Sequence, residues 1–189
     1  KSIYLQRKKN ITKKNTIIPS VFLTMGGSDP AGITLKVLRS IDSLKKEFKC
    51  TILLGPEFIH LNDLNKFLAK SKRKYDVQDG GYDLSDKISK ADIAIISFGV
   101  TAYEMSALGI PSIIISLTDD HARSASIFKK MGMSISLGNF KNLKSKKITD
   151  ALSDLLDNRS KLDEMRSINF QTIDGLGSER IAKIIHEAI

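Results

Sequence analysis

The sequence predicts an α/β domain built on a doubly wound, mostly parallel sheet of six strands. Strand-like and helix-like segments alternate from residue 17 onward, which is the pattern of strands joined by crossover helices. The strand-like segments are nearly continuous apolar runs, and strands covered on both faces need no polar side. Two of these runs end in glycine turns that lead into helices. Together these observations predict a Rossmann-like sheet with the strand order 3-2-1-4-5-6.

The first half of the chain supplies three of the strands. Helices are expected where apolar residues recur every three or four positions, as at Leu61, Leu64 and Leu68. Asp29 is expected to cap the first helix, with Pro30 in its first turn. The expected elements are a strand at 17–25, a helix at 31–48, a strand at 50–54, a helix at 61–71, a strand at 75–78 and a short helix at 84–90.

The second half supplies the other three strands and a helical C-terminus. Gly109 and Pro111 are expected to end one helix, and Asp119 or Asp120 to cap the next. The expected elements are strands at 92–97, 112–117 and 133–137, and helices at 100–108, 119–131, 143–156, 161–169 and 178–189.

Length and composition indicate one globular domain. The chain has 189 residues, of which 41% are hydrophobic and 27% charged, and no apolar run approaches the roughly 20 residues that span a bilayer. The single cysteine, Cys50, lies in an apolar run, so we expect a buried structural thiol and no disulfide. The polar, basic N-terminus does not resemble a signal peptide, and we expect a cytoplasmic protein. Because the chain begins with Lys1 and not Met, we expect it to be part of a longer polypeptide.

The positive charge of the chain is concentrated at its start. Of the net charge of +9, residues 1–14 carry +6, which leaves +3 for the remainder. We therefore expect residues 1–16 to be a basic linker and residues 17–189 to be the folded domain. A second lysine cluster lies at 141–147, but no aromatic residues interleave either cluster as a base-stacking platform would require. Nucleic acid is not an expected partner.

The two glycine turns predict an anion site. Gly26, Gly27 and Ser28 follow the first strand, and Ser97, Gly99, Val100 and Thr101 follow the fourth. In the predicted strand order these two strands are neighbours, and ligands bind beyond their carboxyl ends. Glycines allow a close backbone approach, and the following helix N-termini favour anions. The pair of turns is suited to a diphosphate without a metal ion.

A nucleoside diphosphate would use two further groups. Glu104 lies one helical turn beyond Thr101, where its carboxylate can accept hydrogen bonds from a ribose diol, and the loop at Gly80, Gly81 and Tyr82 can contact a base. Structural alternatives remain open at this point. Glycine turns also close strand–helix units that bind nothing, Ser97 and Thr101 can be simple caps, and Glu104 can be an exposed acid near a helix N-terminus.

Other site types fit less well. The first turn does not match the G-x-G-x-x-G of a dinucleotide site, and no Gly-Lys-Ser/Thr indicates a P-loop. His60, His121 and His186 form no metal-ligand pattern. Asp120 and His121 follow the fifth strand at the same edge and are weaker candidates for contact with a substrate.

Four motifs in series resemble one family. They are residues 22–30, residues 91–95 leading to Gly99-x-Thr101-x-x-Glu104, residues 107–112, and residues 174–181. In this order they resemble the C-terminal half of the UDP-sugar hydrolase of pseudaminic acid biosynthesis and related spore-coat polysaccharide biosynthesis proteins, which belong to the GT-B superfamily. The resemblance covers roughly residues 17–189.

The resemblance implies the nucleotide-binding half of a two-domain enzyme, with a UDP-sugar in the cleft between the halves and no metal or other cofactor. It implies that Glu104 binds the ribose, that the two glycine turns hold the diphosphate, and that the loop near Gly80–Tyr82 lies at the uracil. The catalytic base is expected in the N-terminal half, the partner of this domain. One departure is that Asp120-His121 stands where the family often has Asn-Gln, which leaves the sugar and even hydrolysis open. The alternatives are the donor-binding domain of a GT-B glycosyltransferase and a non-catalytic binding module with acidic partners.

Overall fold

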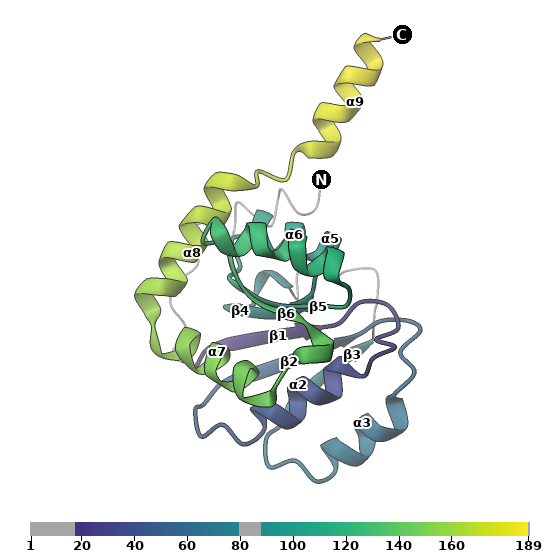
Figure 1. Ribbon diagram of the computed structural model, residues 1–189, viewed down its shortest axis with the longest axis vertical. Coiled ribbons are helices and arrows are strands. Elements are labelled where there is room, and N and C mark those ends of the chain that lie inside the picture. The colour runs from purple at the N-terminus through teal and green to yellow at the C-terminus, as the bar shows by residue number, and fades with distance from the viewer. Residues whose placement is uncertain (1–17, 80–87, 189) are drawn as a thin grey trace.

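The computed structural model describes residues 18–79 and 88–188. The expected linker at 1–16, most of the short helix at 84–90 and the loop at Gly80–Tyr82 lie outside these ranges. Within them, a central sheet is covered by helices on both faces, and the last helix projects away from the body (Figure 1).

The sheet has six parallel strands in the order β3-β2-β1-β4-β5-β6, which confirms the predicted order. The strands are β1 (Ser20–Thr24), β2 (Lys49–Leu54), β3 (Tyr75–Asp79), β4 (Ile93–Ser97), β5 (Ser112–Ser116) and β6 (Ser134–Asn139). Strands β1 and β4 are hydrogen-bonded neighbours, with Thr24 opposite Ile96. The chain ends both strands at the same edge, so the turns that follow them start side by side.

Helices join and cover these strands. They are α2 (Ile33–Ile41), α3 (Leu61–Leu68), α5 (Val100–Ala107), α6 (Asp119–Lys130), α7 (Ser145–Asp157), α8 (Arg159–Thr172) and α9 (Gly177–Glu187), with a short 3-10 turn at Phe140–Asn142. No helix in the described ranges is both long enough and apolar enough to cross a bilayer.

Alternate residues of the central strands enter different hydrophobic cores. In β1, Val21 and Leu23 pack with α2 and α7, whereas Phe22 packs on the other side with α5 and α6. The same alternation separates Ile95 from Ile96 in β4. This two-sided burial explains why the strands read as continuous apolar runs. Cys50 belongs to the first core as expected, and burial raises the pKa of its thiol to about 12.

The first helix is shorter than its sequence pattern predicts. It ends at Ile41 and not near residue 48, because the carbonyls of the next segment have a different partner. The Arg73 guanidinium donates to the carbonyl oxygens of Leu44, Lys46 and Phe48. These three carbonyls therefore face a side chain from the loop before β3 and do not continue the helix.

Two expected helix starts are also corrected. Helix α2 begins at Ile33, so Pro30 lies in the preceding turn and not in the first helical turn. Asp29 does cap the helix with its side chain, but from three residues before Gly32, the residue at the N-cap position. Helix α6 is capped by the Thr118 hydroxyl, which accepts from the His121 N–H, and Asp119 and Asp120 lie in its first turn.

Gly109, in the turn between α5 and β5, has no room for a side chain. Its φ is +66°, and a Cβ there would lie 2.5 Å from the ring of Phe170 on α8. We expect Gly109→Ala to lower the free energy of unfolding by about 2–3 kcal/mol, from overpacking and backbone strain together. Urea denaturation measures this loss. Gly138→Ala is the matched control, because Gly138 also has a positive φ, +78°, but a Cβ there meets nothing within 4 Å. Equal losses in the two variants would contradict the packing argument.

Candidate functional site

The two glycine turns meet at the carboxyl edge of the sheet, as the sequence predicts. A Cβ on Gly26 would lie 3.6 Å from the Ser97 hydroxyl oxygen, so the turn after β1 contacts the residue that ends β4. A cavity of about 240 Å³ opens at this junction, lined in part by Gly26, Gly27, Thr101 and Glu104. Four of the sequence-predicted residues therefore share one cavity.

The turn after β1 is held by its own neighbours. The Gly27 carbonyl accepts a hydrogen bond from the Glu57 N–H at 3.1 Å. A Cβ on Gly55 would lie 2.1 Å from the Gly27 carbonyl oxygen, so only glycine fits where the loop after β2 meets this turn. Gly55, which also lines the cavity, is therefore required for the close packing of two backbone segments and not for ligand binding.

The N-terminus of α2 is already occupied by a carboxylate from the chain itself. Asp29 is 2% exposed, and its two oxygens accept from the N–H groups of Ile33 and Thr34 at 2.9 and 2.8 Å. The expectation that this helix offers free N–H groups to a ligand anion is therefore wrong for these two groups. An internal anion satisfies them and complements the helix dipole.

The N-terminus of α5 is open by comparison. Its N-cap residue is Gly99, and within the described part of the chain no side chain caps the helix and no acidic residue lies in its first turn. A Cβ on Gly99 would meet nothing within 4 Å. The Ala102 N–H bonds to the Gly99 carbonyl at 3.0 Å, so the N–H groups of Val100 and Thr101 are the ones left without a side-chain cap. Such groups at an open helix N-terminus form a site for an anion.

Glu104 lies one turn further along α5 and is half-buried. Removal from solvent raises the pKa of its carboxyl above the ordinary glutamate value. Desolvation makes an ionised carboxylate a stronger acceptor for ligand hydroxyls, and the position beside Thr101 in the cavity wall suits that role.

A second cavity adjoins the first and was not expected from the sequence. It has a volume of about 660 Å³ and lies between α5 and the link from α8 to α9. Glu104 lines both cavities, while Val100 and Tyr103 line only this one. Asp174 and Arg180 form a two-pronged ion pair at its wall, with N–O distances of 2.6 and 3.2 Å. Only the fourth motif of the resemblance, residues 174–181, hinted at a role for this segment.

The remaining predicted residues are distributed differently. Ser28 is half-buried in the turn after β1 but does not line either cavity. Asp120 is exposed and pairs with Arg123 on its own helix. The His121 ring lies 5.9 Å from the ring of Phe98, which belongs to the turn after β4. Gly80, Gly81 and Tyr82 lie outside the described residues. Residues 18–79 and 88–188 contain no cluster of three potential metal ligands among His, Cys, Asp and Glu.

Two curated proteins are similar to the chain in sequence. An uncharacterized protein of Methanocaldococcus jannaschii is 32% identical over 113 residues, which are 59% of this chain and 22% of that protein. The spore coat polysaccharide biosynthesis protein SpsG of Bacillus subtilis is 26% identical over 121 residues, 63% of this chain and 35% of SpsG. The chain thus spans about a third or less of the curated relatives it matches. No known protein-family profile matches it.

The fold is that of a Rossmann-like domain of the GT-B type. MurG of Acinetobacter baumannii superposes with a TM-score of 0.77 at 15% identity, over 99% of this chain and 53% of MurG. The spinosyn rhamnosyltransferase SpnG, complexed with thymidine diphosphate, superposes with a TM-score of 0.65 at 16% identity, over 84% of this chain and 43% of SpnG. SpnG is a rhamnosyltransferase, and the hydrolase expected from the sequence resemblance finds no support among these structures.

Proposed function

We propose that this chain is the donor-binding domain of a glycosyltransferase that acts in surface-polysaccharide synthesis, and that it holds the UDP part of a nucleotide sugar at the carboxyl edge of its sheet. The uncapped N-terminus of α5, one helical turn from the half-buried Glu104, is the observation that carries the proposal. The similarity to SpsG supports the polysaccharide context, and the diphosphate in the SpnG structure supports the ligand class.

Each residue has a proposed task. The diphosphate lies against the first-turn N–H groups of α5, with Ser97 and Thr101 donating hydroxyl hydrogen bonds. The ribose diol donates to Glu104, and the turn at Gly26 and Gly27 forms the opposite wall of the cavity. The chain binds and orients the donor so that the bond between the sugar and the diphosphate faces the second domain. His121 is a candidate for contact with the sugar because it lies against Phe98 of the same turn.

The second domain is the proposed partner of α9. This helix contributes no buried residue, and Ile181, Ile184 and Ile185 are each more than half exposed along one side. Figure 1 shows it extending beyond the rest of the molecule. The chain covers about half of the solved glycosyltransferases it resembles, which supports a second domain of similar size against which this apolar side packs.

Titration calorimetry with UDP tests the proposal. We expect the domain to bind UDP, and Glu104→Gln to weaken binding about tenfold, because a charge-assisted hydrogen bond contributes about 1.5–3 kcal/mol. Glu164→Gln on the surface of α8 is the control and is expected to bind like the parent chain. Absence of binding, or equal binding by all three proteins, would contradict the proposed site.

Binding should also depend on pH through Glu104. Hydroxyl donors favour the ionised carboxylate, so UDP affinity is full above the raised pKa of Glu104 and falls as the pH drops through it. UDP itself takes up a phosphate proton in mildly acidic solution. In Glu104→Gln the UDP phosphate still titrates but the Glu104 carboxyl is absent. The difference between the pH profiles of the parent chain and of this variant therefore reports the titration of Glu104 alone. Parallel profiles would show that the carboxylate does not contact the ligand.

The chemistry of the complete enzyme requires a separate assay. Supplied with a UDP-sugar, a transferase moves the sugar to an acceptor, whereas the hydrolase of the sequence resemblance releases it to water. We expect transfer, because the structural neighbours are glycosyltransferases.

A further inference from the structure

The amino edge of the sheet, opposite the nucleotide site, has a strongly basic surface at β2 and β3. The segments 42–49 and 69–76, which precede or begin these strands, contain seven lysine and arginine residues and three carboxylates, a net charge of +4. We define the lysine edge as five of these cations, all with exposed side chains, namely Lys45, Lys49, Lys70, Lys72 and Lys74. No ion pair with a carboxylate of the described residues involves any of the five.

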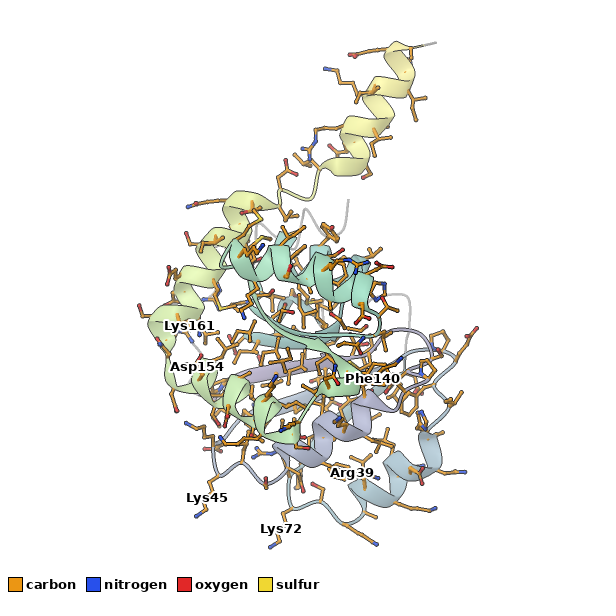
Figure 2. All side chains as sticks on the ribbon, viewed as in Figure 1. Arg39, Lys45, Lys72, Phe140, Asp154 and Lys161 are labelled. Carbon is orange, nitrogen blue, oxygen red and sulfur yellow. The ribbon has the colours of Figure 1, made fainter. Side chains whose placement is uncertain are left out.

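The backbone beneath the lysine edge is tightly connected. Arg73 joins the two segments by donating to three carbonyls of the first, the shortest at 2.7 Å to Leu44. Asp42 joins them again, since one of its oxygens accepts from the hydroxyls of Ser71 and Tyr75 at 2.5 and 3.0 Å. The two segments that carry the lysines are thus held together by hydrogen bonds, and Figure 2 shows Lys45 and Lys72 extending outward from them.

Like charges are neighbours on this surface. Cys50 is paired with Tyr75 in the parallel ladder of β2 and β3, so Lys49, the first residue of β2, and Lys74, the residue before β3, lie beside each other. Adjacent like charges on paired strands are destabilising unless an anion offsets them.

We propose that the lysine edge docks the protein on an anionic lipid surface. Clusters of four to eight lysines or arginines bind such surfaces electrostatically. The aromatic rings nearby are unsuited to stacking on bases, because Phe48 is buried under the Arg73 guanidinium at 3.9 Å and the Tyr75 ring packs against the ring of Phe67. A single-stranded nucleic acid would require a free stacking platform. Docking through the amino edge leaves the nucleotide site at the carboxyl edge facing away from the membrane.

Vesicle co-sedimentation of the full chain tests this proposal. We expect binding to vesicles of mixed phosphatidylglycerol and phosphatidylcholine, and none to phosphatidylcholine alone. Binding should weaken steeply between about 0.1 and 1 M salt, as the screening length falls from about 10 to about 3 Å. The combined variant K45Q/K72Q/K74Q should bind about a hundredfold more weakly, because each lysine near the surface contributes about fivefold.

The control is K141Q/K144Q/K147Q, which removes the same charge from exposed lysines that follow the carboxyl end of β6. It should retain the binding of the parent chain. Thermal melting of both variants checks that they fold. Equal losses in the two variants, or binding that ignores vesicle charge, would overturn the proposal. Displacement of the protein from the vesicles by a short DNA oligonucleotide at equal phosphate concentration would assign the edge to nucleic acid instead.

Discussion

Replacing Gly99 with aspartate is expected to weaken UDP binding about a hundredfold while leaving the domain slightly more stable. Gly99 is the N-cap residue of α5, its φ of 170° is extended backbone, and a Cβ there meets nothing within 4 Å. A new carboxylate can therefore accept from the first-turn N–H groups, which adds a few tenths of a kcal/mol to the free energy of unfolding relative to glycine. The same carboxylate occupies the space assigned to the diphosphate.

The matched variant is Gly99→Asn, which has the same shape and capping ability without the charge. We expect Gly99→Asn to weaken UDP binding only modestly, and Gly99→Asp to weaken it about a hundredfold, because juxtaposed like charges cost several kcal/mol. Calorimetric titration measures the affinities and thermal melting the stabilities. Equal affinities in the two variants would show that no phosphate lies at the N-terminus of α5, whatever else binds in the cavity.

The sheet could be predicted from the sequence because its determinants are local. Each central strand is an apolar run bounded by turn residues, and each is joined to the next by a helix-length segment. Few strand orders are compatible with such connections. The meeting of Gly26 with Ser97 then follows from the strand order alone, since parallel neighbours end at the same edge.

The parts that could not be predicted depend on partners distant in sequence. The early end of α2 reflects the contact of Arg73 with the carbonyl of Leu44. The requirement for glycine at position 55 reflects its approach to the Gly27 carbonyl. Neither residue has a local signal that names its partner. The wall formed by Asp174 and Arg180 likewise depends on where α8 places the link to α9.

The residues of the candidate site could be predicted from the sequence, but not which of the two helix N-termini is open to a ligand. Both glycine turns were expected to hold phosphate through the helices that follow them. In the structure one helix N-terminus is filled by Asp29 and the other is open. The difference comes from the turn at residues 29–32, which is closed by the Gly32 N–H bond to the Asp29 carbonyl at 3.0 Å. This turn directs the Asp29 carboxylate back onto α2.

Removing the Asp29 carboxylate is expected to cause the largest loss of stability among the substitutions considered. In Asp29→Ala two buried N–H groups lose a charged acceptor, and a non-glycine residue without a polar side chain must keep a φ of +46°. We expect a loss of about 3–4 kcal/mol in the free energy of unfolding, measured by urea denaturation. Asp29→Asn keeps one acceptor oxygen and tolerates positive φ, so about 1–2 kcal/mol is expected. If Asp29→Ala lost less than about 3 kcal/mol, the Asp29 carboxylate would not stabilise the N-terminus of α2 as proposed.

The Asp29→Asn variant also distinguishes between the two helix N-termini as the phosphate site. If the diphosphate lay at α2, loss of the competing negative charge would tighten UDP binding. If it lies at α5, as proposed, UDP affinity should stay within about twofold of the parent chain, because Asp29 lines neither cavity and its carboxylate is held against the N-terminus of a different helix. Unchanged affinity in Asp29→Asn together with lost affinity in Gly99→Asp would locate the phosphate at one helix N-terminus by two independent changes of charge.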